Sequence, residues 1–313
     1  MPADPTNLFV ALSGKKALLT WDASGTGGVA DYSVFRRSPS TRAAFDPAVD
    51  TAIAAGITTT SYVDAGLAVG TYDWEVFGRV PASTPPIAGY TAWYDASDTS
   101  SITASGVAVS QWNDKSGNGY HLTQGTGSNQ PTTGTRTINS LNAIDFDGTA
   151  DYLSNTSFAF NVNTMTWLAV FLSDAKNANN PRVTTFTTTS TTNDYDNTSS
   201  AIVMSHTNAD AFETDYNSNS YTTAPTTGSA VQFTVKRNGA AWNHWKNGTA
   251  GGSMSSVTTN FNPGVLWVGA TYAGGVGGWW DGLIAEIVMY PTALSDGDRV
   301  SVQDYLKAKW GTP

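Results

Sequence analysis

Short apolar segments separated by turn residues run through most of this sequence. In the first part of the chain, Tyr72, Trp74 and Val76 alternate with acidic residues, so one face of the segment would pack on a core and the other would meet water. Segments of this kind, rich in aromatic and β-branched residues, are typical of half-buried strands. The pattern predicts an all-β fold.

The all-β pattern continues from Gly89 onward. Two Asn-Gly pairs, Asn238-Gly239 and Asn247-Gly248, tolerate the positive φ angles of tight hairpin turns. They predict an antiparallel pair over residues 231–246 and a further reversal at 247–248. The strand candidates in this part are Ala143–Phe146, Thr166–Leu172, Ala201–Ser205, Val231–Lys236, Ala241–Lys246, Val265–Ala270 and Leu283–Tyr290.

One helix is predicted, close to residue 313. Ser295 can cap its first turn, with an acidic residue three positions later, and Val302, Tyr305 and Leu306 then share one helical face. Gly311 is placed to end it.

The chain divides at a proline-rich segment. Pro81–Pro86 contains three prolines, which fix φ and remove backbone donors, so it predicts a semi-stiff connector. We therefore expect one domain over residues 1–80, a linker over 81–88 and a second domain over 89–313. Within the first domain, Pro39–Gly56 is rich in alanine and lacks a strand pattern.

Composition narrows the classes of function. The formal net charge is −9, from scattered aspartates without a lysine or arginine cluster, which argues against nucleic-acid binding. The absence of cysteine excludes disulfides and thiolate metal sites. The first ten residues do not form an ordinary export signal, and no long apolar run predicts membrane insertion.

Residues 1–80 resemble a fibronectin type III domain. Leu19-Thr20-Trp21 is similar to its second strand, Tyr32–Arg37 to its third, and Gly66–Tyr72 to the corner before its sixth. The resemblance implies a small β-sandwich.

Residues 89–313 resemble the concanavalin A-like (laminin G-like) jelly-roll domains of bacteriophage virion proteins. Four stretches in the family's order carry the likeness: Ala92–Asp98, Trp112–Gly119, Ile144–Asp147 with the turn up to Leu153, and Gly282–Tyr290 leading into the closing helix. The family implies a lectin-like sandwich, which is carbohydrate-binding in some members and purely structural in others.

The motifs of catalysis are weak. Glycosidases with this sandwich place two carboxylates across a cleft, commonly on a Glu-x-Asp-x-Glu strand, and this strand is missing. Glu286 stands alone in its strand, and Asp145 and Asp147 are interpreted as turn residues before Gly148. We therefore predict no catalytic residues and a protein that is not an enzyme.

Calcium is the one cofactor that the sequence keeps open. An oxygen-only site needs several carboxylates converging from loops, and the resemblance implies such a site at one rim of the sandwich. Asp147, Asp151 and Asp281 are its candidate ligands, although scattered aspartates in turns commonly cap backbone amides instead.

Eleven tryptophans suggest where a ligand binds. Trp279 and Trp280 follow the glycine-rich loop 274–278, and strand alternation should turn one of them outward. Indoles beside polar residues suit the C–H faces of sugars, and packing against another domain or subunit is the alternative. The candidate ligand-binding residues are Trp279, Trp280, Trp242 and Tyr272.

Together these features predict a non-enzymatic bacteriophage virion protein, in a tail fibre, a tail tip or a head decoration. Its expected partners are other virion proteins, further copies of itself and host-surface polysaccharide, with no nucleic acid. The alternatives are a polysaccharide hydrolase and a carbohydrate-binding module of a bacterial enzyme.

Overall fold

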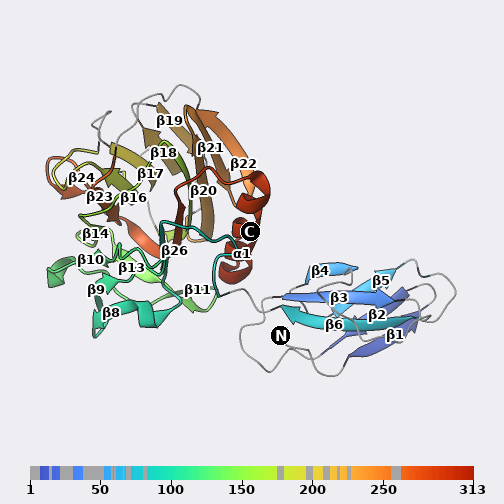
Figure 1. Ribbon diagram of the computed structural model, residues 1–313. Helices are drawn as coiled ribbons and strands as arrows, with labels where there is room; N and C mark the ends of the chain where they lie inside the picture. Colours follow the sequence, from blue (N-terminus) through green and yellow to red (C-terminus); the bar gives the residue numbers. More distant parts are fainter. Residues whose placement is uncertain are drawn as a thin grey trace. The chain divides into compact units, whose positions relative to one another are not determined.

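The computed structural model describes residues 8–13, 16–21, 31–37, 53–57, 59, 61–65, 67, 72–79, 83–174, 180–194, 200–206, 212–216, 219–223, 227–254 and 262–313. Strands dominate, so the all-β prediction is confirmed (Figure 1). The chain forms two compact units, 1–84 and 85–313, and their boundary falls inside the proline-rich segment.

The smaller unit contains two three-stranded sheets within its described residues. One has the order β1-β2-β5 and the other β4-β3-β6. The strands are β1 (Phe9–Ser13), β2 (Lys16–Thr20), β3 (Asp31–Arg37), β4 (Ala54–Ile57), β5 (Ser61–Ala65) and β6 (Asp73–Arg79). Strand β4 corrects the prediction that Pro39–Gly56 lacks strands, because Ala54–Gly56 pairs with β3; residues 38–52 lie outside the described residues.

The core of the smaller unit explains its strand pattern. Trp21 and Tyr32 meet edge to face at 5.3 Å, and Leu19 and Val34 are fully buried beside them. The alternating aromatic residues predicted to face the core, Tyr72 and Trp74 among them, pack against this cluster. The indole Nε1 of Trp74 also donates to the buried carboxylate of Asp64 at 2.8 Å.

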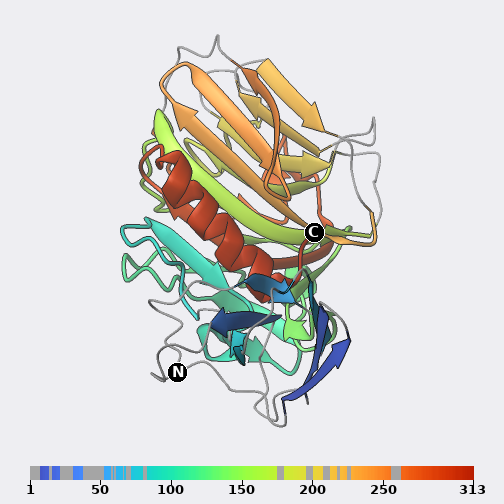
Figure 2. The same ribbon diagram turned by 90° about the vertical axis from the view of Figure 1, so that its right-hand side faces the viewer.

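The larger unit is built from two large sheets. As far as the structure describes the chain, one sheet has nine strands in the order β19-β18-β17-β16-β23-β14-β10-β9-β8. The other has seven, in the order β13-β26-β15-β20-β21-β22, with β7 also paired to β26. The one α-helix among the described residues, α1 (Asp296–Trp310), packs on the seven-stranded sheet along β15 and β20, and Figure 2 shows it lying across this face.

Strands of the nine-stranded sheet are β8 (Ile102–Ser105), β9 (Ala108–Trp112), β10 (Leu122–Thr123), β14 (Leu153–Asn155), β16 (Arg182–Thr187), β17 (Ser200–His206), β18 (Phe212–Tyr216), β19 (Asn219–Thr223) and β23 (Val265–Val268). Those of the seven-stranded sheet are β7 (Ala92–Asp95), β13 (Ile144–Asp147), β15 (Thr164–Ser173), β20 (Ala230–Asn238), β21 (Ala241–Lys246), β22 (Thr249–Met254) and β26 (Asp281–Tyr290). Two small pairs, β11 (Thr137–Ile138) with β12 (Leu141–Asn142) and β24 (Thr271–Tyr272) with β25 (Val276–Gly277), and two 3-10 turns, η1 (Thr99–Ser101) and η2 (Gly127–Asn129), complete the described elements.

The predicted elements of this unit are confirmed with small shifts of their ends. Each of the seven strand candidates coincides with a strand, and β21 has the predicted bounds. Asn247 and Gly248 have positive φ at the second hairpin turn. In the helix, Ser295 Oγ accepts from the amide of Asp298 at 3.1 Å, and Gly311 ends it with a φ of 65°.

Strand β15 is apolar on both faces because both are covered. Trp167 and Phe171 point into the core between the two sheets, whereas Leu168 and Val170 lie under the helix. This double burial accounts for the nearly continuous apolar run of the strand.

Strand β26 carries a β-bulge. Val170 pairs with Glu286, but the next residue, Phe171, pairs with Ile284, so Ala285 is an extra residue in β26. A bulge re-aims the neighbouring side chains. Here Glu286 turns toward the helix, where its carboxylate contacts Tyr305 and Lys309.

Candidate functional site

Two of the four predicted ligand-binding residues belong to the core. Trp242 and Trp280 are both fully buried, and Trp280 meets Phe171 edge to face at 5.3 Å. Neither indole can offer a face to a ligand. The prediction for these two residues is corrected, because the alternation on β21 and before β26 turns them between the sheets.

The other two, Trp279 and Tyr272, are partly exposed beside the glycine-rich loop. Tyr272 lies in the short β24–β25 hairpin, and its carbonyl accepts from the amide of Asp194 at 2.8 Å. These two residues stay candidates for a surface site.

The three predicted calcium ligands lie close together, and the carboxylates of two of them, Asp147 and Asp151, bind backbone amides. Asp147 and Asp281 are cross-strand partners, and the carboxylate of Asp151 accepts from the amide of Asp147 at 3.1 Å. One oxygen of Asp147 accepts from the amides of Thr149, Ala150 and Asp151, and the other accepts from the Thr149 hydroxyl.

This arrangement does not fit a calcium ion. The carboxylate oxygens of Asp147 accept hydrogen bonds from the turn at Gly148, as the turn interpretation expected. No group of three or more metal-binding side chains occurs among the described residues. Burial, reinforced by the charge of Asp147, raises the pKa of Asp151 to about 7. The hydrogen bonds within the turn lower the pKa of Asp147, although its partial burial opposes them.

Asp145 has a different partner from Asp147. It forms an ion pair with Arg136 at 3.1 Å, and the same guanidinium pairs with Asp174. The turn interpretation therefore describes Asp147 and not Asp145.

Glu286 anchors the helix and is not isolated. Its carboxylate is fully buried and accepts from the indoles of Trp93 and Trp310 at 2.8 and 2.7 Å. It also accepts from the Tyr305 hydroxyl at 2.7 Å and from Lys309 Nζ at 2.8 Å. Lys309 in turn pairs with the buried Asp95 at 2.8 Å. In this network, which we call the helix clasp, each carboxylate oxygen of Glu286 accepts at least one hydrogen bond from α1.

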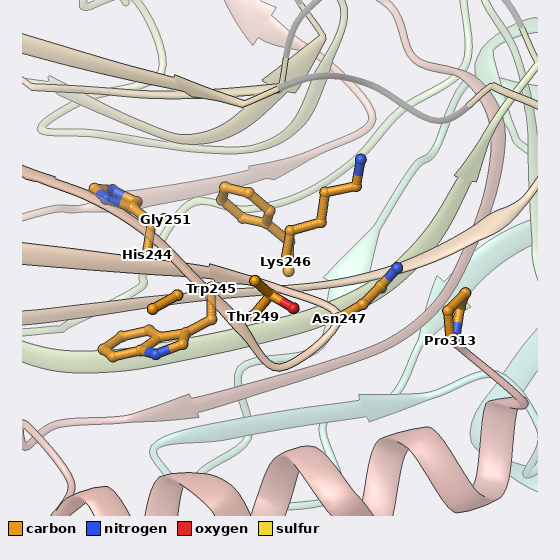
Figure 3. Close-up of a pocket in the computed structure, with 9 residues that line it drawn as sticks. His244, Trp245, Lys246, Asn247, Thr249, Gly251 and Pro313 are labelled. Carbon is orange, nitrogen blue, oxygen red and sulfur yellow. The ribbon is translucent and has the colours of Figure 1, made fainter.

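A cavity of about 470 Å³ lies at the β21–β22 hairpin (Figure 3). Aromatic and polar groups line it together, and the hairpin supplies most of them. Its described lining residues are Phe233, His244, Trp245, Lys246, Asn247, Thr249, Ala250, Gly251 and Pro313.

Alternation along β21 sorts the side chains at this hairpin. His244 and Lys246 project on one side of the sheet, and His244 packs on Phe233 with ring centroids 6.3 Å apart (Figure 3). Trp245 projects on the helix side, where the guanidinium of Arg299 lies 4.0 Å from its ring centroid. Helix α1 therefore fixes the orientation of this indole.

A hydrogen bond orients Asn247 in the cavity, and burial sets the charge of His244. Asn247 Oδ1 accepts from the amide of Gln232 at 2.9 Å, so Asn247 Nδ2 keeps its donor capacity for a ligand. Burial lowers the pKa of His244 to about 4, so its imidazole is neutral near pH 7. The sequence held a signal for this site, because alternation separates Trp245 from the buried Trp242, but that signal alone does not show a cavity.

No protein-family model and no curated protein sequence matches this chain. Its fold, however, matches solved structures. An arabinofuranosidase complexed with arabinofuranosyl-α-1,2-xylobiose is 15% identical, with a TM-score of 0.54, and the match covers 74% of this chain and 61% of the enzyme. A family 54 α-L-arabinofuranosidase soaked with a cyclic sulfate inhibitor is 16% identical, with a TM-score of 0.52 and the same coverage.

A sialidase from Trypanosoma rangeli in complex with sialic acid matches more of this chain. It is 11% identical with a TM-score of 0.51, and the match covers 96% of this chain and 52% of the sialidase. The chain thus spans only part of each enzyme. At these identities the likeness establishes the fold, and the fold is one that carbohydrate-active enzymes use.

The comparisons contradict the prediction that this protein is not an enzyme. That prediction depended on the missing Glu-x-Asp-x-Glu strand, whereas the solved structures that share the fold include arabinofuranosidases and a sialidase. The missing strand excludes one arrangement of carboxylates and not carbohydrate processing in general. Separately, none of the described helices has the length and apolar character needed to cross a membrane.

Proposed function

We propose that this protein is directed at polysaccharide, and that the larger unit binds a glycan in the cavity at the β21–β22 hairpin. The fold shared with arabinofuranosidases and a sialidase supports a carbohydrate ligand. The proposal follows the alternative drawn from the sequence, a polysaccharide hydrolase or its carbohydrate-binding module.

The observation that carries the proposal is the composition of the cavity. Sugar-binding sites combine an aromatic ring, for the apolar face of the sugar, with polar groups for its hydroxyls. Trp245 supplies a partly exposed ring, whereas Phe233 is buried at the base of the cavity, and Asn247 and Thr249 supply hydrogen-bonding groups. A volume of about 470 Å³ lies within the range of small-molecule sites.

Affinity electrophoresis of the full chain against a panel of neutral and acidic polysaccharides tests this function. Trp245→Ala should weaken binding about ten- to a hundredfold, because it removes a ring from the cavity wall. Trp245→Phe keeps an aromatic face and should retain part of the affinity. Melting temperatures measured beside binding separate loss of the site from loss of the fold, since Trp245 also packs on Arg299.

Trp279→Ala is the matched control. Trp279 is also a partly exposed tryptophan, but it lies at the glycine-rich loop and does not line the cavity. If Trp279→Ala abolishes binding while Trp245→Ala has no effect, the glycan binds at the loop. If none of the polysaccharides in the gels retards the migration of the unaltered chain, the proposed function is wrong.

Hydrolysis is measured on the same panel by the release of reducing ends. The placement on a bacteriophage particle, with virion proteins and further copies of the chain as partners, rests on the sequence motifs alone and stays a prediction. The fibronectin type III assignment of the smaller unit stays a prediction in the same way.

A further inference from the structure

We propose that Lys309 and Asp95 join in an intramolecular isopeptide bond, which the protein forms on its own with Glu286 as the proton carrier. The amine of Lys309 and the carboxyl group of Asp95 condense to an amide and release water. The bond ties helix α1 covalently to strand β7 and makes the helix clasp permanent.

The first argument is the contact between the three groups. Asp95 and Glu286 are cross-strand partners on β7 and β26, so their side chains leave the sheet on the same face. Lys309 reaches this pair from α1, and its Nζ lies 2.8 Å from Asp95 Oδ1 and 2.8 Å from Glu286 Oε2. Because a carbonyl bond is about 1.23 Å long, Nζ lies within about 4 Å of Asp95 Cγ, near the roughly 3–3.5 Å of a reactive arrangement.

The second argument is the separation of these groups from water. Asp95 and Lys309 are buried and Glu286 is fully buried. Three aromatic residues around them, two of which belong to α1, donate hydrogen bonds to Glu286. Burial of an ammonium and a carboxylate carries a desolvation cost, and a neutral amide in their place relieves it. The exclusion of water also protects the finished bond from hydrolysis.

Glu286 is placed to move the protons that the reaction requires. Burial raises the pKa of Glu286, and the charge of Asp95 adds to the rise while Lys309 opposes it. A raised pKa suits a carboxylate that accepts a proton from the Lys309 ammonium and donates it again. Glu286 passes this proton to Oδ2 of Asp95, so the ion pair becomes a neutral amine beside a neutral acid. Nζ then attacks Cγ, and the C–N bond forms.

Two neighbours of Asp95 stabilise the tetrahedral intermediate. The amide and the hydroxyl of Ser97 donate to Oδ1 at 3.0 and 2.6 Å, where negative charge develops. Lys115 Nζ lies 3.2 Å from Oδ2. Glu286 carries a second proton from Nζ to Oδ2, the bond from Cγ to Oδ2 breaks, and this oxygen leaves as water. The carbonyl at Oδ1 re-forms, so the step is a condensation without any change of oxidation state.

Mass spectrometry of the purified full chain tests the bond. The intact mass should be lower than that of the unlinked sequence by one water molecule, and trypsin should release a joined peptide that contains both Asp95 and Lys309. A chain with the full mass of the sequence would overturn the proposal. A loss of water confined to one peptide, which indicates a succinimide, or a link from Asp95 to Lys115, would overturn it as well.

Lys309→Arg keeps the positive charge but lacks the amine, so this variant should retain the full mass. Lys307→Arg makes the same change at an exposed position of α1 and should still lose one water molecule. On denaturing gels the linked chain should migrate faster than Lys309→Arg, because the bond closes a long loop in the unfolded chain. Equal migration of the two would contradict the link.

Glu286→Gln tests the role of the proton carrier. The rate at which freshly synthesised chain becomes linked should fall about a hundredfold or more in this variant. Melting curves recorded on the same samples separate the loss of the carrier from the loss of the fold. Linkage at an unaltered rate in folded Glu286→Gln would refute the role assigned to Glu286.

Discussion

Replacing Glu286 by glutamine is expected to destabilise the larger unit more than any conservative change on the helix surface. Four donors converge on the two carboxylate oxygens, from Trp93, Tyr305, Lys309 and Trp310. Glutamine keeps one acceptor oxygen and turns an NH₂ group toward donors, so part of the helix clasp is left unsatisfied in a buried site.

The magnitude follows from the burial of the clasp. Removing one partner of a buried ion pair costs about 3–5 kcal/mol, and the lower end applies because Asp95 remains beside Lys309. For a unit of this size, about 3 kcal/mol corresponds to a fall in Tm of roughly 6–12 °C. Differential scanning calorimetry should show this fall in the transition of the larger unit only.

Asp304→Asn is the control, because it makes the same carboxylate-to-amide change at an exposed position of α1. It should change the free energy of unfolding by less than about 0.5 kcal/mol. If Glu286→Gln melts within about 2 °C of the unaltered chain, apolar contacts alone hold the helix and the argument for the clasp is refuted.

Three further outcomes are expected. Because burial raises the folded-state pKa of Asp151 from 3.8 to about 7, its stabilising contribution is complete below pH 3.8 and is lost as the pH rises to about 7. Asp151→Asn should weaken the pH dependence of the free energy of unfolding, measured by urea unfolding, and should raise that free energy by on the order of 2 kcal/mol above pH 7. An unchanged pH dependence would contradict the assignment. Gly282→Ala should cost more than about 3 kcal/mol, since its Cβ would lie 2.1 Å from the carbonyl oxygen of Leu172, and wild-type melting would refute this. Limited proteolysis should cut first between residues 81 and 89 and leave both units folded; joint loss of the two would disprove their independence.

Local patterning was sufficient to predict most of the fold. The alternation and the Asn-Gly turns define β20 and β21, and the serine cap and Gly311 define α1, because each of these signals acts within a few residues. The strand β15 was predicted as Thr166–Leu172, but its burial on both faces was not.

The site was harder to predict because it depends on contacts between distant segments. Trp93 and Glu286 are 193 positions apart, and a bulge at Ala285 decides that Glu286 faces the helix. A period of two also separates the faces of a strand without showing which face is buried, so Trp280 could not be distinguished from Trp279. The cavity itself appears only when β21, β22 and the chain after the helix come together.

The position of α1 along the chain has a consequence for biosynthesis. The helix covers Leu168, Val170 and Val288, all of which leave the ribosome before residues 296–310 do. Until the helix has emerged and docked, the newly made sheet exposes an apolar face and the acidic side chain of Glu286 without its partners in α1. Nascent chains halted before residue 296 should therefore be the species that chaperones retain and that aggregates most readily.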